Sequence, residues 1–273
     1  MSYFAGLDIG STAIKVALVD RDGRLVGVHV AATGSHFHRN AQEALQTLLV
    51  RHDIAREQLR YLIATGYGRK LFKEADDSIS EITANALGAH EVGKAFGGVR
   101  TIINIGGQDS KAILIDAEGS VANFAMNDKC AAGTDRFLDV TARNLGLDLD
   151  ELGACHLSSQ GTPLAINSTC TVFAESEIIG LLAHGHGKPE IVAGIHYSIA
   201  RRTVRLAKRV GIEDRVYFDG GPALNQGLVA ALQDELQREI VVPEFPQTTT
   251  AFGAAILARS EYLAEASLSS SAA

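Results

Sequence analysis

Alternating apolar and polar positions near the N-terminus predict a three-stranded hairpin unit over residues 3–30. An apolar strand leads into Asp8-Ile9-Gly10-Ser11-Thr12, a second strand runs from Ile14 to Val19, and Asp22-Gly23 supplies the turn before a third strand. The first strand therefore ends in a small polar turn.

The same pattern returns at residues 101–126. One constant offset pairs Gly10 with Gly106 and Lys15 with Lys111. Because the repeated piece is a whole supersecondary unit, we expect two similar lobes rather than a short-repeat solenoid.

Each copy places a glycine-bearing turn at the tip of its first hairpin. Glycine lets backbone N–H groups approach an anion closely, and Ser11 and Thr12 add hydroxyl donors. Two such turns facing each other across a cleft would grip a polyphosphate from both sides. The alternative is that the glycines only make tight turns, and their recurrence in register favours phosphate binding.

Apolar spacing predicts the remaining elements. Helices are expected around 41–49, over 79–92, near 133–146, 171–184 and 189–210, through 228–236 and from about 251, with strands at 61–64, 215–218 and 240–242. The loop Ala64-Thr65-Gly66-Tyr67-Gly68-Arg69 either meets a ligand or closes a turn.

Composition narrows the class of protein. The chain has 273 residues, 46% of them hydrophobic, and a net charge of −7, so it has no basic excess for binding nucleic acid. No apolar run approaches the length of a membrane span and no signal peptide is evident, which predicts a cytoplasmic protein. Three cysteines, Cys130, Cys155 and Cys170, are too few for a disulfide scaffold.

One of these cysteines lies beside a predicted helix start. Cys130 precedes Ala131-Ala132-Gly133-Thr134, and apolar periodicity begins at Phe137. A helix N-terminus favours a thiolate, a phosphate or an anionic metal cluster, and the residues alone leave that choice open.

The motifs together resemble those of the ATP-dependent activators of 2-hydroxyacyl-CoA dehydratases, within the actin-like ATPase superfamily. The related ATPase subunits of benzoyl-CoA reductase share much of the pattern. The matching stretches are residues 8–12, 64–69, 105–109, 126–134 and 168–177.

The resemblance implies an α/β fold with duplicated ribonuclease-H-like lobes and a nucleotide cleft between them. We expect lobe I over 1–98, completed by the C-terminal helix, lobe II over 99–265, and a flexible tail over 266–273.

The resemblance also implies a homodimer that holds one [4Fe-4S] cluster on its two-fold axis. Such a cluster takes four thiolates, and Cys130 and Cys170 give two in each chain. Either cysteine alone would more simply be a small core residue. Cys155 lies outside both motifs and is expected to be an ordinary thiol.

Residue roles follow from the matched motifs. Asp8 would hold Mg²⁺ through water, and Gln108 or Asp109 would orient the attacking water. The expected ATP/ADP contacts are Ser11, Thr12, Ala13, Ile14, Lys15, Gly106, Gly107, Gln108, Gly133, Thr134, Gly220, Gly221, Asn225 and Gln247.

Three positions depart from the family pattern. Asn104 stands where aspartate is usual, Asp135 replaces a glycine, and Asp219 replaces a threonine. We expect these changes to affect nucleotide hydrolysis rather than the cluster.

The function that this resemblance implies is ATP-coupled one-electron transfer to a 2-hydroxyacyl-CoA dehydratase, with reduced ferredoxin or flavodoxin as the electron donor. One alternative is the ATPase subunit of a benzoyl-CoA reductase. Another is a cluster-free small-molecule kinase or nucleotide-switched binding module, although no sugar-binding motif is evident.

Two further features carry less weight. His184 and His186 could bind a metal, but a solvated loop is the simpler interpretation. The basic positions of residues 201–209 predict a solvated helix face or, alternatively, a docking patch for an acidic partner.

Overall fold

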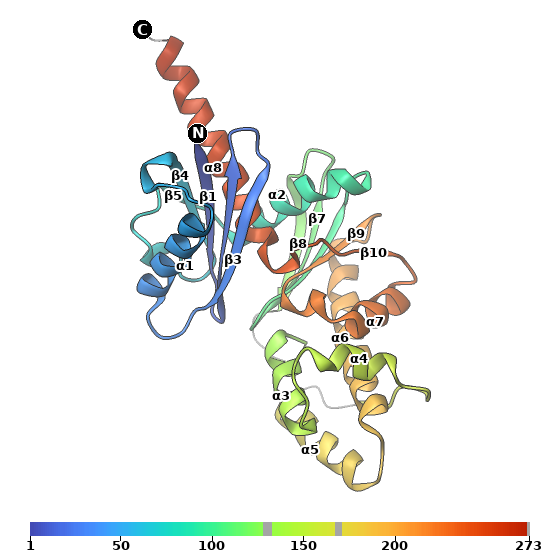
Figure 1. The fold of residues 1–273 in the computed structure, drawn as a ribbon. Coiled ribbons are helices and arrows are strands. Elements are labelled where there is room, and N and C mark those ends of the chain that lie inside the picture. Colours follow the sequence, from blue (N-terminus) through green and yellow to red (C-terminus); the bar gives the residue numbers. More distant parts are fainter. Residues whose placement is uncertain (128–132, 167–170, 272–273) are drawn as a thin grey trace. The chain divides into compact units, whose positions relative to one another are not determined.

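The chain forms two compact units in a computed structural model, which describes residues 1–127, 133–166 and 171–271. Unit 1 comprises Met1–Gly98, Asp116–Val121 and Gln247–Ala273, and unit 2 comprises Val99–Ile115 and Ala122–Pro246. Each unit contains one five-stranded sheet (Figure 1).

The sheet of unit 1 has the strand order β3-β2-β1-β4-β5. Its strands are β1 (Tyr3–Ile9), β2 (Ala13–Asp20), β3 (Leu25–Ala32), β4 (Leu59–Thr65) and β5 (Asp77–Ser78). The antiparallel pairing of β1 with β2 and of β2 with β3 confirms the predicted hairpin unit. β4 lies parallel to β1 on the other side.

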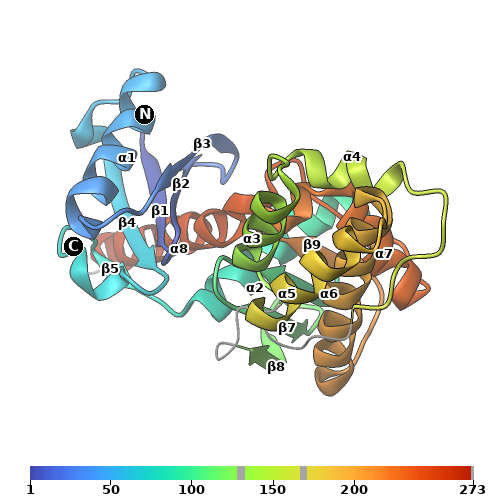
Figure 2. The ribbon, with the colours of Figure 1, turned by 90° about the horizontal axis from the view of Figure 1, so that it is seen from below.

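Helices cover both faces of this sheet. They are α1 (Phe37–Arg51), α2 (Glu81–Gly93) and α8 (Thr249–Ser271). On β1, Leu7 packs into the core formed with α1, whereas Phe4 packs into the core formed with α8. Alternate residues of the strand thus serve opposite faces, as the two-residue period of a strand requires. Figures 1 and 2 show the helices that cover these faces.

The sheet of unit 2 repeats this topology, with the order β10-β9-β6-β7-β8. Its strands are β6 (Thr101–Ile105), β7 (Ser110–Ile115), β8 (Val121–Asn127), β9 (Val216–Asp219) and β10 (Ile240–Val241). β9 lies parallel to β6 as β4 lies parallel to β1. The internal repeat predicted from the hairpins therefore extends to the whole sheet.

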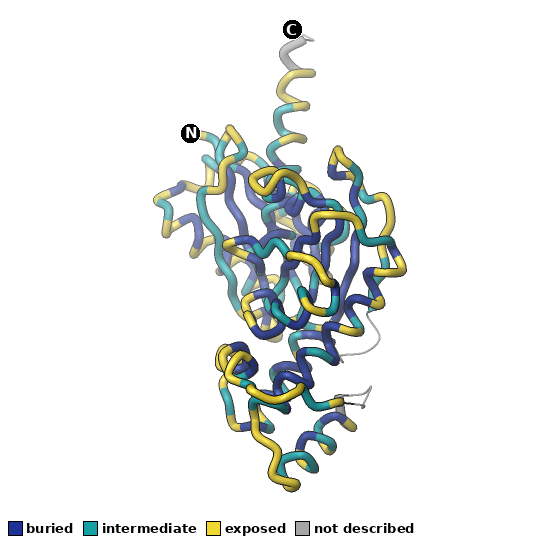
Figure 3. The backbone as a smooth tube through the Cα atoms, turned by 90° about the vertical axis from the view of Figure 1, so that its right-hand side faces the viewer, coloured by how far each residue is buried: buried dark blue, intermediate teal, exposed yellow. Residues whose placement is uncertain are grey.

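Five helices complete unit 2. They are α3 (Asp135–Leu145), α4 (Glu151–Leu157), α5 (Thr171–Ala183), α6 (Lys188–Val210) and α7 (Gln226–Leu236). Ile103 of β6, Phe218 of β9, Ile195 of α6 and Leu232 of α7 share one buried core. Buried positions gather on the inner strands of both sheets, whereas the edge strands β3, β5, β8 and β10 are half-buried or exposed (Figure 3).

Three helices differ from the predictions, and the two-residue strand β5, which has no apolar residue, was not predicted. α4 was not predicted, because its seven residues ELGACHL are too short to show a helical period. α2 starts at Glu81 rather than 79, because Ser80 Oγ accepts the Thr83 N–H and caps the helix.

The third difference is the C-terminal end. Residues 266–271, expected as part of a flexible tail, are helical as the last turns of α8. Extending an existing helix requires no new nucleation, and Ser267 Oγ donates to the Ala264 carbonyl. α8 belongs to unit 1 and completes the first lobe.

Within the described segments, no helix is both long and apolar enough to cross a bilayer.

Candidate functional site

The first glycine turn, in unit 1, is closed by a short backbone bond. Gly10 N–H donates to the Ala13 carbonyl over 3.1 Å, and Thr33 Oγ1 donates to the Gly10 carbonyl over 2.8 Å. In the described chain the amides of Ser11 and Thr12 donate to no carbonyl. Two adjacent unused N–H groups at a partly exposed turn can receive an anion.

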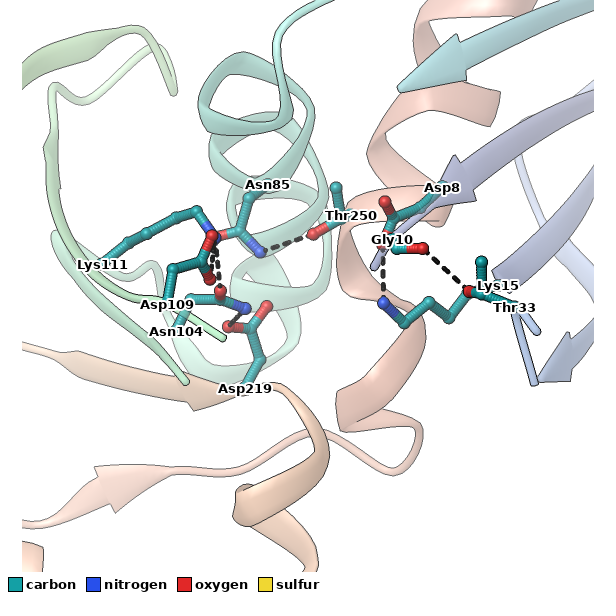
Figure 4. A network of polar contacts seen from close by, with 10 residues as sticks. All are labelled: Asp8, Gly10, Lys15, Thr33, Asn85, Asn104, Asp109, Lys111, Asp219 and Thr250. Atoms are coloured by element: carbon teal, nitrogen blue, oxygen red, sulfur yellow. Dashed lines mark hydrogen bonds and ion pairs between the residues drawn. The ribbon is translucent and has the colours of Figure 1, made fainter. Parts of the chain in front are cut away.

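Asp8 lies at the end of β1, directly before this turn. Its Oδ2 accepts from Lys15 Nζ over 3.0 Å (Figure 4). A Cβ placed on Gly66, whose φ is +83°, would lie 2.4 Å from Asp8 Oδ1. The glycine loop after β4 therefore closes against Asp8, and Gly68 N–H donates to the Ile9 carbonyl.

The second glycine turn, in unit 2, has the same backbone geometry. Gly106 N–H donates to the Asp109 carbonyl over 2.8 Å. In the described part of unit 2, the amides of Gly107 and Gln108 donate to no carbonyl. The Gln108 side chain is exposed, whereas Asp109 is buried. This turn thus offers the same backbone donors as the turn in unit 1.

The lysine of the second turn, however, has a different partner. Lys111 corresponds to Lys15, and its Nζ lies 2.6 Å from Oδ1 of Asp109, a carboxylate at the position that Ala13 occupies in unit 1. Both side chains of this pair are buried. Because the repeat places Asn104 where unit 1 has Asp8, the charge that pairs with the lysine has moved from the strand end to the turn.

Asn104 connects this pair to the neighbouring strand. Its Nδ2 donates to Asp219 Oδ1 over 2.8 Å, and its Oδ1 lies 3.5 Å from Lys111 Nζ (Figure 4). An aspartate at 104 would place a second carboxylate against buried Asp219. The two departures at 104 and 219 therefore belong to one network.

The start of α3 joins the second turn. Asp135 N–H donates to the Gly106 carbonyl over 3.0 Å, and Arg136 N–H donates to the Gly107 carbonyl over 3.3 Å. Gly133, with φ +98°, and Thr134, the buried N-cap residue, are thereby placed next to this turn.

The glycine pair after β9 also reaches this place. A Cβ on Gly220, whose φ is +97°, would lie 2.0 Å from the Ile105 carbonyl oxygen, so only glycine fits. A Cβ on Gly221 would lie 3.3 Å from Asp135 Oδ2. The Asp135 carboxylate thus lies beside the glycine pair and in the first turn of α3, where the helix dipole favours negative charge.

The last two predicted nucleotide contacts, Asn225 and Gln247, lie on segments that adjoin Gly220. Asn225 is the N-cap of α7, and its Oδ1 accepts the Leu228 N–H over 3.0 Å. Gln247 follows Pro246, whose carbonyl accepts the Gly220 N–H over 2.9 Å. Unit 2 therefore gathers three of the predicted motifs, whereas the first turn and Gln247 belong to unit 1.

The predicted cluster ligands Cys130 and Cys170 lie outside the described residues. Cys155 is half-buried in α4, and burial raises the pKa of its thiol. Across residues 1–127, 133–166 and 171–271, no group of three or more His, Cys, Asp or Glu side chains could hold a metal ion.

Three features of the site region were not predicted. Thr33 supports the first turn from the end of β3. A buried pair, His156 and His196, adjoins Asn225. A cavity of about 300 Å³ borders Arg202, Arg205 and Arg209 of α6. Of these, only the arginines gave a sequence signal, through their helical spacing.

Comparison with known proteins identifies the fold and the family. The chain is 43% identical over 259 residues to the 2-hydroxyisocaproyl-CoA dehydratase activator of Clostridioides difficile, covering 95% of this chain and 96% of that one. It is 44% identical over 258 residues to the activator of lactoyl-CoA dehydratase of Anaerotignum propionicum, covering 94% and 97%.

Solved structures agree with this relationship. The activator of the 2-hydroxyisocaproyl-CoA dehydratase from Clostridium difficile with bound ADPNP matches with a TM-score of 0.91 and 42% identity over 97% of both chains. A ROK family glucokinase from Streptomyces griseus, at 16% identity and a TM-score of 0.58 over 95% of this chain and 100% of that one, shares the fold alone. Residues 5–258 match the BadF/BadG/BcrA/BcrD ATPase family, and the chain is a member of that family.

Proposed function

We propose that this protein is an activating ATPase that delivers single electrons from a [4Fe-4S] cluster, shared by two copies of the chain, to a 2-hydroxyacyl-CoA dehydratase. The observation that carries the proposal is the pair of equivalent glycine turns in a chain that also holds two cysteine motifs of the activator type. Reduced ferredoxin or flavodoxin would supply the electrons.

The nucleotide part of the proposal rests on the two turns. Ser11 and Thr12 in unit 1, and Gly107 and Gln108 in unit 2, have amides that donate to no carbonyl in the described chain and suit phosphate oxygens. Asp8 is the carboxylate that would hold Mg²⁺ through water. Oxygen ligands suit this ion, and Lys15 keeps the carboxylate in place.

The water-positioning role falls to Gln108 in this proposal. Its side chain is exposed at the tip of the second turn, whereas the Asp109 carboxylate is buried and paired with Lys111. Asp109 would instead fix Lys111 behind the turn.

The cluster part rests on thiolate number and helix position. A [4Fe-4S] cluster takes four thiolates, so Cys130 and Cys170 from each of two chains would hold it, and when bound it supplies single electrons. α5 begins at Thr171, directly after Cys170. The N-terminal end of a helix stabilises the negative charge that a reduced cluster gathers.

Sequence identity favours a dehydratase as the partner. Two relatives at 43% and 44% identity are named as dehydratase activators. A benzoyl-CoA reductase subunit of Thauera aromatica is 33% identical over 88% of this chain and 85% of that one. We therefore place the reductase system second.

Anaerobic purification followed by iron and sulfide analysis tests the cluster. We expect about four irons per dimer, a visible absorption band that bleaches on reduction, and loss of both in Cys130→Ser and Cys170→Ser. The matched control Cys155→Ser should keep its iron, since that thiol lies in α4 outside both motifs.

Other outcomes would point to the alternatives. A colourless, iron-free protein from strictly anaerobic cells would rule out electron transfer. Stable copurification with unlike subunits would favour the reductase system. Phosphorylated sugar as a product of ATP turnover would indicate a kinase.

A further inference from the structure

Two histidines are buried against each other where α4, α6 and α7 meet. The Nδ1 atoms of His156 and His196 lie 2.8 Å apart, and the ring centroids are 5.0 Å apart. His196 is fully buried, and burial lowers its pKa to about 3; burial also lowers the pKa of His156. Both rings are therefore neutral at neutral pH.

The position of each ring proton follows from Asn225. Its Oδ1 accepts the Leu228 N–H over 3.0 Å, so its Nδ2 is the atom 3.1 Å from His196 Nε2. An amide nitrogen only donates, and His196 Nε2 must therefore be the acceptor and carry no proton.

The tautomer of His156 follows from that of His196. Neutral His196 carries its proton on Nδ1 and donates it to His156 Nδ1, which must accept. His156 then carries its own proton on Nε2. Each ring thus has one defined tautomer, set by the capping bond of α7.

Glycines make room for this arrangement on both sides. A Cβ on Gly227 would lie 2.7 Å from His156 Cβ and 2.8 Å from its Nδ1. A Cβ on Gly153 would lie 3.1 Å from Asn225 Oδ1. The three polar side chains are therefore packed closely enough to fix one another.

Asn225 links the pair to the glycine motif. It ends the short turn Gly221–Leu224, which begins next to Gly220 and Asp135. Its side chain has two N–H groups, of which His196 accepts one, and the residue is only half-buried. Among the described residues no hydrogen bond uses the second N–H, so it is available to an acceptor on a bound molecule.

We propose that His196, oriented by His156, is a positioning residue for the nucleoside of ATP: it holds the Asn225 amide so that the turn Gly220–Asn225 presents an N–H donor to the nucleoside. The identity of the ligand rests on the proposed function. The proton positions of the two histidine rings do not depend on that function.

The first experiment reads the tautomers directly in the full-length protein labelled with ¹⁵N-histidine. Two-bond proton–nitrogen spectra should show His196 protonated only on Nδ1 and His156 only on Nε2. A His196 ring protonated on Nε2 would overturn the proposal.

The second experiment measures the affinity for Mg-ADP in two matched variants. The terminal amide of Gln reaches the position of Nε2, whereas that of Asn reaches only the position of Nδ1. His196→Gln should therefore bind within about twofold of the wild type, and His196→Asn about fivefold more weakly, which corresponds to one lost hydrogen bond.

Controls separate positioning from folding. His186→Asn changes an exposed histidine and should bind as the wild type does. Asn225→Ser keeps a good helix cap but removes the amide, so this variant should bind Mg-ADP weakly. It therefore tests the proposal also in the case that His196→Asn does not fold. Equal affinity of the two His196 variants, or wild-type affinity of Asn225→Ser, would overturn the proposal.

The two proposals can fail separately. A wild-type protein that binds no Mg-ADP would overturn the proposed function and the ligand assigned to the turn, while the tautomers would stand as measured.

Discussion

Asn104 and Asp219 act as one polar pair in unit 2. The amide of Asn104 donates to buried Asp219 and lies near Lys111, which already holds Asp109. A neutral amide satisfies both neighbours without adding a third carboxylate to a network in which Lys111 pairs with Asp109. The residue at 104 is therefore determined by the residue at 219.

Exchanging the pair for the residues usual in the family tests this coupling. Asn104→Asp alone should lower the free energy of unfolding by about 3 kcal/mol, because it places a carboxylate against Asp219. Asp219→Thr alone should lower it by about 1–2 kcal/mol through the lost acceptor. In the double variant the two changes should compensate, with a coupling of about 2 kcal/mol in urea unfolding.

The exposed residue Gln160 supplies the control, since Gln160→Glu should change stability by less than about 0.5 kcal/mol. Strict additivity of the two substitutions would show that residues 104 and 219 are independent.

At the scale of elements, α8 is held closely between β1 and α2. A Cβ on Gly253 of α8 would lie 1.9 Å from the Ala84 carbonyl oxygen, and one on Gly6 of β1 would lie 1.9 Å from the Ala251 carbonyl oxygen. At both places the backbones of two elements are in contact. The packing of these elements therefore requires glycine, which has no side chain.

Two glycine-to-alanine variants distinguish packing from helix propensity. Gly253→Ala should lower the free energy of unfolding by about 1–3 kcal/mol, because α8 must move away from α2. Gly180→Ala lies in α5 with no described atom within 4 Å of the new Cβ, and should raise it by about 1 kcal/mol. Thermal or urea unfolding of both variants gives the answer, and a stabilised Gly253→Ala would contradict this account of the α2–α8 contact.

Most strands and helices were predictable because their apolar residues keep a regular period, whereas β5 consists of two exposed polar residues and was not predicted. β1, β2 and their repeats alternate, and α6 keeps its spacing over 23 residues. α4 was not predicted because it is shorter than two helical periods and mixes small with polar residues.

The candidate site was predictable in its glycines but not in its polar partners. A turn needs its glycine locally, so Gly10 and Gly106 could be identified from sequence. Asn104 and Asp219, or His156 and His196, meet only after distant elements pack. The cluster ligands Cys130 and Cys170 remain predictions.

At the scale of the whole molecule, the two units have separate cores, and the core of unit 2 contains a fully buried histidine that resists protonation. Unit 2 contains the buried histidine pair, whereas the cores of unit 1 are formed by β1, β2, α1 and α8. His196 takes up a proton near pH 6.5 when unfolded and near pH 3 when folded. The unfolded chain binds more protons in that interval, so stability falls as the pH decreases through it.

Urea unfolding at pH 7 and pH 5 measures this effect. The free energy of unfolding of unit 2 should fall by roughly 1 kcal/mol per pH unit below about 6 through His196 alone. His196→Gln should flatten this dependence, whereas His186→Gln, at an exposed site, should leave it unchanged. Parallel profiles for the wild type and His196→Gln would mean that folding does not lower the pKa of His196.

The return of α8 to the first sheet sets the order in which the chain can mature on the ribosome. Phe4, Val19 and Ile63 expose one apolar sheet face until Ala251 and Ala255, which come much later in the chain, have been synthesised. Unit 2 lies almost entirely between these segments and can fold first. The sheet of unit 1, whose strands are all synthesised before unit 2, is therefore completed only after unit 2.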